Sequence, residues 1–149
     1  MLETHNIEDA IYDGTLRLGG EEWFFLGEGA DRIVFHNGAL VIKFPNHMYH
    51  GARSNANGVE FEVYNMVVGT PAARHLAPTL ALLDEYREGD VLVAVKVSGS
   101  SVRDYTRTHA TVEDKLRHLL AFFGIGVSDT HPGNFVGSRV IDYGRFYFY

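Results

Sequence analysis

The chain contains no cysteine, and this absence excludes two kinds of stabilising site. Its 149 residues can form neither disulfide bonds nor thiolate metal centres. Every apolar run is much shorter than the roughly 20 residues of a membrane-spanning helix. The acidic start, MLETHNIEDA, lacks the charged and apolar regions of a signal peptide. We therefore expect a soluble, cytoplasmic protein that does not bind membranes.

Basic charge is also scarce. The sequence has 13 Lys and Arg against 19 Asp and Glu, a net charge of −6, and its basic residues are scattered. Proteins that bind nucleic acid normally present a basic surface to the phosphates, so we do not expect nucleic acid as a partner. With 46% hydrophobic residues and no linker-like stretch, the chain is expected to form a single domain.

The most informative residues lie in two short motifs, DTHPGNF at residues 129–135 and DYG at 142–144. Asp129 and Asn134 are five positions apart, the spacing of the D-x-x-x-x-N catalytic loop of kinases. Phosphoryl transfer needs a carboxylate facing the nucleophile and oxygen ligands that hold Mg²⁺ on the phosphates. We predict Asp129 for the first task, and Asn134 and Asp142 as the metal ligands.

The intervening segment FVGSRVI supports this grouping. It consists of two short β-like runs around Gly137-Ser138, a pair suited to a tight hairpin turn. Such a hairpin returns Asp142 to the neighbourhood of Asn134.

The two motifs resemble the catalytic loop and metal motif of the protein-kinase-like superfamily. DTHPGN, with His131 two residues after the aspartate, is nearer to the aminoglycoside and choline phosphotransferase and ABC1-type branches, and Val127-Ser128 replace the usual His-Arg. We expect His131 to support the loop. The resemblance implies ATP and Mg²⁺ as cofactors. It also implies an α+β, minimal kinase-like fold: an antiparallel-sheet N-lobe with one packed helix (1–97), then a reduced C-lobe with one helix and the catalytic-loop hairpin (98–149).

The resemblance extends upstream to LGEGADRIVF at residues 26–35. Gly27, Gly29 and Val34 match the phosphate-covering turn L-G-x-G-x-x-G-x-V, while Arg32 replaces the third glycine. Glycine lets a backbone approach phosphate oxygens closely. We predict nucleotide binding by Gly27, Gly29 and Val34. For Arg32 a solvated side chain is favoured over a phosphate contact.

Lys43 in ALVIKF resembles the strand lysine that pairs with nucleotide phosphates. Alternation along 39–44 puts Leu40 and Ile42 on one face and Val41 and Lys43 on the other. In isolation Lys43 suits a snorkelling surface lysine. Its position in this series of motifs favours a catalytic, nucleotide-binding role.

A glutamate partner for Lys43 is expected on the helix predicted over 56–68, whose apolar stripe is formed by Val59, Val63, Met66 and Val67. Glu60 and Glu62 flank the stripe. We favour Glu60, because Asn57, Glu60 and Tyr64 resemble the family's helix. Glu62 and two solvated glutamates remain the alternatives.

The remaining pattern predicts a short helix at 6–12 and a helix from Thr111 to 123, closed by Gly124. Strands are predicted at 15–18, 22–26, 32–36, 39–44 and 90–97, with turns at Gly19-Gly20 and Asn37-Gly38. Residues 75–83 are ambiguous. Residues 98–108 suit either a crossing between lobes, which would line the cleft, or a plain loop.

Only RFYFY follows the DYG motif, so we expect a minimal acceptor site, built from 98–108 or supplied by another chain. The tail itself predicts a buried or pairing strand, or a partner contact if exposed. The leading hypothesis is an ATP- and Mg-dependent phosphotransferase acting on a protein or small-molecule hydroxyl. The rival is a kinase-shaped protein that binds and regulates a protein partner. The sequence leaves the oligomeric state open.

Overall fold

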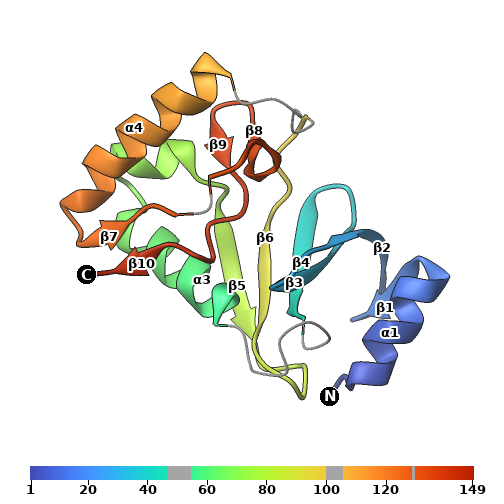
Figure 1. Cartoon of the computed structure of the whole chain (residues 1–149). Coiled ribbons are helices and arrows are strands. Elements are labelled where there is room, and N and C mark those ends of the chain that lie inside the picture. Colours follow the sequence, from blue (N-terminus) through green and yellow to red (C-terminus); the bar gives the residue numbers. More distant parts are fainter. Residues whose placement is uncertain (47–54, 100–105, 129) are drawn as a thin grey trace. The chain divides into compact units, whose positions relative to one another are not determined.

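A computed structural model of the chain describes residues 1–46, 55–99, 106–128 and 130–149 (Figure 1). These residues cluster into two units. The first comprises 1–58 and 80–96, and the second comprises 59–79 and 97–149. Each unit has a hydrophobic core of its own.

The first unit is built on a six-stranded sheet with strand order β1-β2-β3-β4-β6-β5. Its strands are β1 (Thr15–Leu18), β2 (Glu21–Glu28), β3 (Arg32–His36), β4 (Leu40–Pro45), β5 (Thr79–Leu83) and β6 (Val91–Val95). Neighbours from β1 to β4, and β4 with β6, pair antiparallel. The bounds of β1 and β3 are those predicted, and β6 lies within its predicted segment. β2 extends one residue before and two residues beyond its prediction, β4 is displaced by one residue, and β5 resolves the ambiguous segment.

The predicted glycine turns close two hairpins of this sheet. Gly19 and Gly20 have φ of 61° and 77°, and Gly38 has φ of 96°. These left-handed values suit glycine because a side chain would strain them. The side-chain oxygen of Asn37 accepts hydrogen bonds from the backbone N–H groups of Ala39 and Leu40 at 3.1 and 2.7 Å.

One face of the sheet carries the core of the first unit, together with helix α1 (Thr4–Asp13). Ile42 and Phe44 of β4 belong to that core, and the rings of Phe35 and Phe44 meet edge to face with centroids 5.9 Å apart. Because side chains alternate along a strand, Val41 and Lys43 lie on the opposite face. The predicted alternation of β4 is confirmed.

The second unit is built on helices and short hairpins. Its helices are α3 (Ala56–Val67) and α4 (Arg107–Ala121), and the first turn of α3 clusters with the first unit. Two 3₁₀ turns, η1 (Pro71–His75) and η2 (Pro132–Asn134), belong to the same unit. Its short strands are β7 (Ile125–Gly126), β8 (Phe135–Val136), β9 (Arg139–Val140) and β10 (Tyr147–Phe148). Strand β7 lies next to the end of helix α4 (Figure 1). The α+β class predicted from the sequence is confirmed.

Helix α4 begins four residues before the predicted start at Thr111. Thr106 is its N-cap: the hydroxyl accepts a hydrogen bond from His109 N–H at 3.4 Å, and His109 Nδ1 accepts one from Thr106 N–H at 3.0 Å. The start at Thr111 is therefore wrong. Histidine seldom fills the third position of a capping box, where Glu or Gln is usual, so the pattern T-x-x-H hides the start.

One further expectation, that for Met66, needs adjustment, whereas the pairing strand predicted for the aromatic tail is confirmed. Met66 of the predicted apolar stripe is 39% exposed, whereas Val63 and Val67 are buried in the core of the second unit. In the aromatic tail, β10 pairs antiparallel with β7 and Phe146 is buried, while the side chains of Tyr147 and Tyr149 are exposed. Among the described helices, none combines the length and apolar character needed to cross a membrane.

Candidate functional site

Three predicted nucleotide-binding residues lie side by side across the sheet of the first unit. Gly27 of β2 is the register partner of Val34 on β3, and Val34 is the partner of Lys43 on β4. The row continues to Leu92 on β6. Lys43 is buried on the face opposite the aromatic core. The register thus places one cation at the centre of a row that otherwise carries glycine and apolar side chains.

Gly27 and Gly29 have no evident structural reason to be glycine. Neither has a positive φ, and a Cβ built at either position meets no atom within 4 Å. An alanine would therefore fit the folded chain at both positions. This open backbone is what a closely bound ligand requires, because a Cβ there would occupy the ligand's space.

Hydrogen bonds to Asn46 fix the turn that contains Gly29. The side-chain amide of Asn46 donates to Gly29 O at 2.8 Å, and its backbone N–H donates to Asp31 O at 2.9 Å. Gly29 N–H closes the turn by donating to Arg32 O at 2.9 Å. Asn46 is 1% exposed. Sequence reasoning missed this residue; the signal was a lone asparagine directly after a buried strand.

Arg32 is buried, so the favoured interpretation of a solvated side chain is wrong. Its guanidinium donates to Asn57 Oδ1 at 3.3 Å. The Asn57 amide in turn donates to Lys43 O at 2.8 Å and to Asp90 O at 2.9 Å. A buried cation needs hydrogen-bond partners. Arg32 has such a partner in Asn57, which lies in the first turn of α3.

Glu60 and Glu62, the two candidate partners of Lys43, differ in burial. Glu60 is fully buried, and its carboxylate accepts a hydrogen bond from Tyr143 N–H at 3.0 Å. Glu62 is exposed. The alternative with both glutamates in solvent is therefore wrong. Lys43 and Glu60 belong to different units, and their pairing stays a prediction.

The predicted metal ligands come together in the second unit. Gly137 has φ of 59° in the turn between β8 and β9, and the hairpin is closed by Ile141 N–H, which donates to Asn134 O at 2.7 Å. Asp142 is the next residue. The hairpin inferred from FVGSRVI is therefore present. Asn134 is additionally held by its backbone N–H, which donates to His131 O at 2.9 Å.

Asp142 is held by its neighbour Tyr143. The Tyr143 backbone N–H is bound by Glu60, and its buried hydroxyl donates to Ala77 O at 2.6 Å. Both contacts orient the backbone of the DYG motif while the Asp142 side chain stays partly exposed. One carboxylate and one amide oxygen suit Mg²⁺, which usually keeps water and phosphate oxygens as its other ligands.

Helix α4 contacts residues on both sides of the predicted catalytic loop. Arg117 donates to Val127 O at 3.1 Å, and the ring of His109 stacks on Phe135 with centroids 4.6 Å apart. Asp129, the predicted catalytic carboxylate, lies outside the described residues, as does most of the predicted crossing segment. The roles assigned to both stay predictions.

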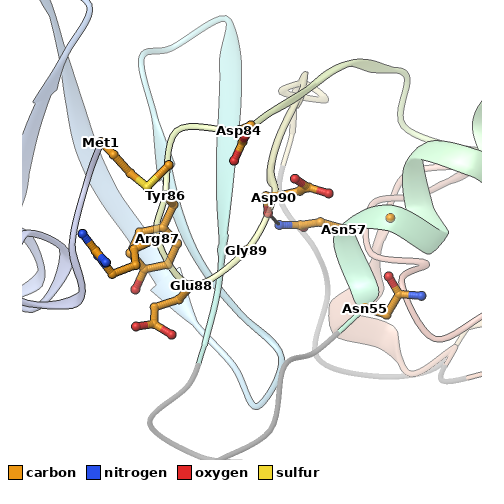
Figure 2. A pocket seen from close by; sticks show the side chains of 10 residues that line it. Met1, Asn55, Asn57, Asp84, Tyr86, Arg87, Glu88, Gly89 and Asp90 are labelled. Atoms are coloured by element: carbon orange, nitrogen blue, oxygen red, sulfur yellow. Dashed lines mark hydrogen bonds between the residues drawn. The ribbon is translucent and has the colours of Figure 1, made fainter.

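A pocket of about 400 Å³ opens elsewhere in the first unit, between the start of α3 and the loop joining β5 to β6 (Figure 2). Asn57 and Asp90 line it, but none of the predicted catalytic, nucleotide-binding or metal-binding residues does. Its wall includes Tyr86, and burial raises the pKa of that phenol. Within the described ranges, no three His, Cys, Asp or Glu side chains form a metal cluster.

Solved structures share this fold. The bifunctional kinase-methyltransferase WbdD matches 92% of this chain with 19% identity and a TM-score of 0.59. The co-crystal structure of WbdD with the kinase inhibitor LY294002 matches 91% with 20% identity and a TM-score of 0.60. The chain spans 37% and 36% of these two structures. No protein-family model and no curated protein matches the sequence. The comparisons thus show a fold that resembles part of WbdD.

Proposed function

We propose that the protein binds ATP with Mg²⁺ and transfers the terminal phosphoryl group to a hydroxyl acceptor. The observation that supports this most strongly is the row of Gly27, Val34 and Lys43. It combines an open glycine backbone with a lysine on one face of the sheet. The fold shared with a kinase supports the same assignment.

The first unit supplies the groups for the nucleotide. The open backbone at Gly27 and Gly29 would let phosphate oxygens approach closely, and the Lys43 ammonium would offset part of their charge. Leu26, which is 51% exposed beside Gly27, and the half-buried Val34 offer apolar surface to the base. The chain's net charge of −6 makes such a local cation necessary for a polyanionic ligand.

The second unit supplies the groups for the metal and the acceptor. Asn134 and Asp142 present an amide and a carboxylate oxygen, which would hold Mg²⁺. When bound, Mg²⁺-ATP supplies the phosphoryl group and the charge neutralisation that its transfer needs. Asp129 would accept the proton of the acceptor hydroxyl, and Glu60 fixes the backbone next to Asp142 through its bond to Tyr143.

The test is transfer of labelled phosphate from γ-labelled ATP to a serine-, threonine- and tyrosine-rich protein and to a panel of sugars and amino alcohols. Replacement Asp129→Asn should lower transfer by about a hundredfold or more, the typical loss of a positioned acid–base group. ATP binding should persist. The matched control is Asp114→Asn, an exposed position on α4. Transfer that survives unchanged in Asp129→Asn would contradict the proposal.

Nucleotide binding without transfer to any acceptor would favour the rival function, a kinase-shaped protein that regulates a protein partner. In that case a pull-down should return one partner in stoichiometric amount, and its recovery should not depend on ATP or on Asp142→Ala.

A further inference from the structure

We infer that Asn46, Arg32 and Asn57 are positioning residues that preform the turn at 29–31 for the outer phosphates of the nucleotide. This inference rests on the proposed nucleotide site and adds a preference for triphosphates over monophosphates. The turn is fixed before any ligand arrives, although the sequence resembles a flexible glycine loop.

The first support is the hydrogen bonding of the turn itself. Asn46 holds it at both ends, through Gly29 O at 2.8 Å and Asp31 O at 2.9 Å. Asn46 is 1% exposed, so these bonds are shielded from competing water. A turn that depended only on glycine would lose more conformational freedom on binding than this one.

The second support is the connection between the turn and Lys43. Arg32 begins β3 directly after the turn, and its side chain donates a hydrogen bond to Asn57. In the phosphate-covering motif that the sequence resembles, this position is the third glycine. Asn57 donates to the carbonyl oxygen of Lys43 and to that of Asp90, and Figure 2 shows Asn57 beside Asp90. All three positioning residues are at most 4% exposed. One buried network therefore sets both the turn and the strand that carries the cation.

The physical consequence is a lower ordering cost on binding. A ligand that meets a preformed turn does not have to immobilise it, and affinity rises by the cost that is saved. The saving applies to ligands whose outer phosphates reach the turn. AMP lacks those phosphates, so its affinity should not depend on the network.

The experiment measures the dissociation constants of ATP and AMP, each with Mg²⁺, by calorimetric titration of the whole chain. The variants are Asn46→Ala and, as matched control, Asn37→Ala. Asn37 also holds a turn of the same sheet through two side-chain bonds to backbone, but in the hairpin between β3 and β4. Asn46→Ser serves if Asn46→Ala does not fold, because a hydroxyl keeps a polar group in the site.

We expect Asn46→Ala to weaken ATP up to about tenfold, the upper end of the effect of losing one net hydrogen bond, that of the Asn46 side chain to Gly29 O, and to change AMP by less than about twofold. Asn37→Ala should leave the ratio of the two constants at the parent value. If Asn46→Ala weakens the binding of ATP and AMP equally, or weakens neither, the inference is overturned. The proposed site still stands in that case, provided that the parent protein binds ATP. If the parent binds neither nucleotide, the proposed function fails and the inference with it.

Discussion

At the scale of single residues, Gly27 and Gly29 allow folding and binding to be separated. Among the described glycines with a clear structural reason, most have a positive φ, such as Gly38 at 96°. Gly27 has neither a positive φ nor a neighbour within 4 Å of an added Cβ. The fold would accept alanine there, and only a ligand would be displaced.

We predict that Gly27→Ala keeps or slightly raises the unfolding midpoint, because alanine lowers the entropy of the unfolded chain by an equivalent of about 0.4–1 kcal/mol. The same variant should bind Mg²⁺-ATP at least about tenfold more weakly, a loss of about 1.4 kcal/mol. Thermal unfolding and calorimetric titration provide the two readouts. The control Gly38→Ala should lose stability instead and keep its ATP affinity. Loss of stability in Gly27→Ala with unchanged ATP affinity would contradict the site.

Tyr86 predicts how stability changes in alkali. Burial raises the pKa of its phenol above the ordinary 10.0, the carboxylates of Glu88 and Glu8 raise it further, and a hydrogen bond with Thr4 opposes them. In the unfolded chain the phenol ionises at about pH 10, whereas the folded chain keeps the proton to higher pH. The contribution of Tyr86 is therefore complete below about pH 10 and is lost as pH rises above it.

Urea unfolding at about pH 9 and about pH 11 tests this linkage. The parent should lose more unfolding free energy between these two values than Tyr86→Phe, which has no phenol to ionise. Tyr12 is 92% exposed, so Tyr12→Phe should decline as the parent does. An equal decline in parent and Tyr86→Phe would show that the phenol is not shielded.

At the same scale, local motifs were easier to predict than buried polar contacts. The candidate roles of Lys43 and Val34 could be predicted from alternation and motif spacing. The strand register of β3 and β4 then makes the two residues direct partners. Asn46 was missed and the burial of Arg32 was not predicted, because their partners, Gly29 O and Asn57, are distant in the sequence. Single-residue patterns contain no information on such pairings.

At the scale of elements, the start of α4 is the clearest disagreement between sequence and structure. Glu113 and Asp114 favoured a helix beginning at Thr111, since acidic residues are common in a first turn. The Thr106 cap lies earlier, and its hydroxyl satisfies one of the open N–H groups of the first turn. The β8–β9 hairpin was predictable because its turn and pairing are local.

Two threonine variants distinguish the possible starts of α4. Thr106→Ala should lower the free energy of unfolding by about 1 kcal/mol, the usual cost of a lost N-cap. Thr111→Ala, an exposed change inside the helix, should leave stability within about 0.5 kcal/mol of the parent. Chemical denaturation of both variants decides between them. A greater loss in Thr111→Ala would restore the start that the sequence predicted.

At the scale of the whole molecule, the groups assigned to the nucleotide and to the metal belong to different units. Gly27 and Lys43 lie in the first unit, whereas Glu60, Asn134 and Asp142 lie in the second. Their joint action is therefore the central claim of the proposed function. Sequence motifs predicted both groups in order. The acceptor was not predictable, because no motif in the chain specifies one.

The most direct test of that claim is thermal unfolding of the parent and of Asp142→Ala with Mg²⁺-ATP, and with ATP plus chelator. Ligand at about a hundred times its dissociation constant should add about 2.7 kcal/mol to the parent, a rise of several degrees. The rise should require Mg²⁺ and should be lost in Asp142→Ala but kept in Asp114→Ala. A parent midpoint that does not move at saturating Mg²⁺-ATP would contradict the account.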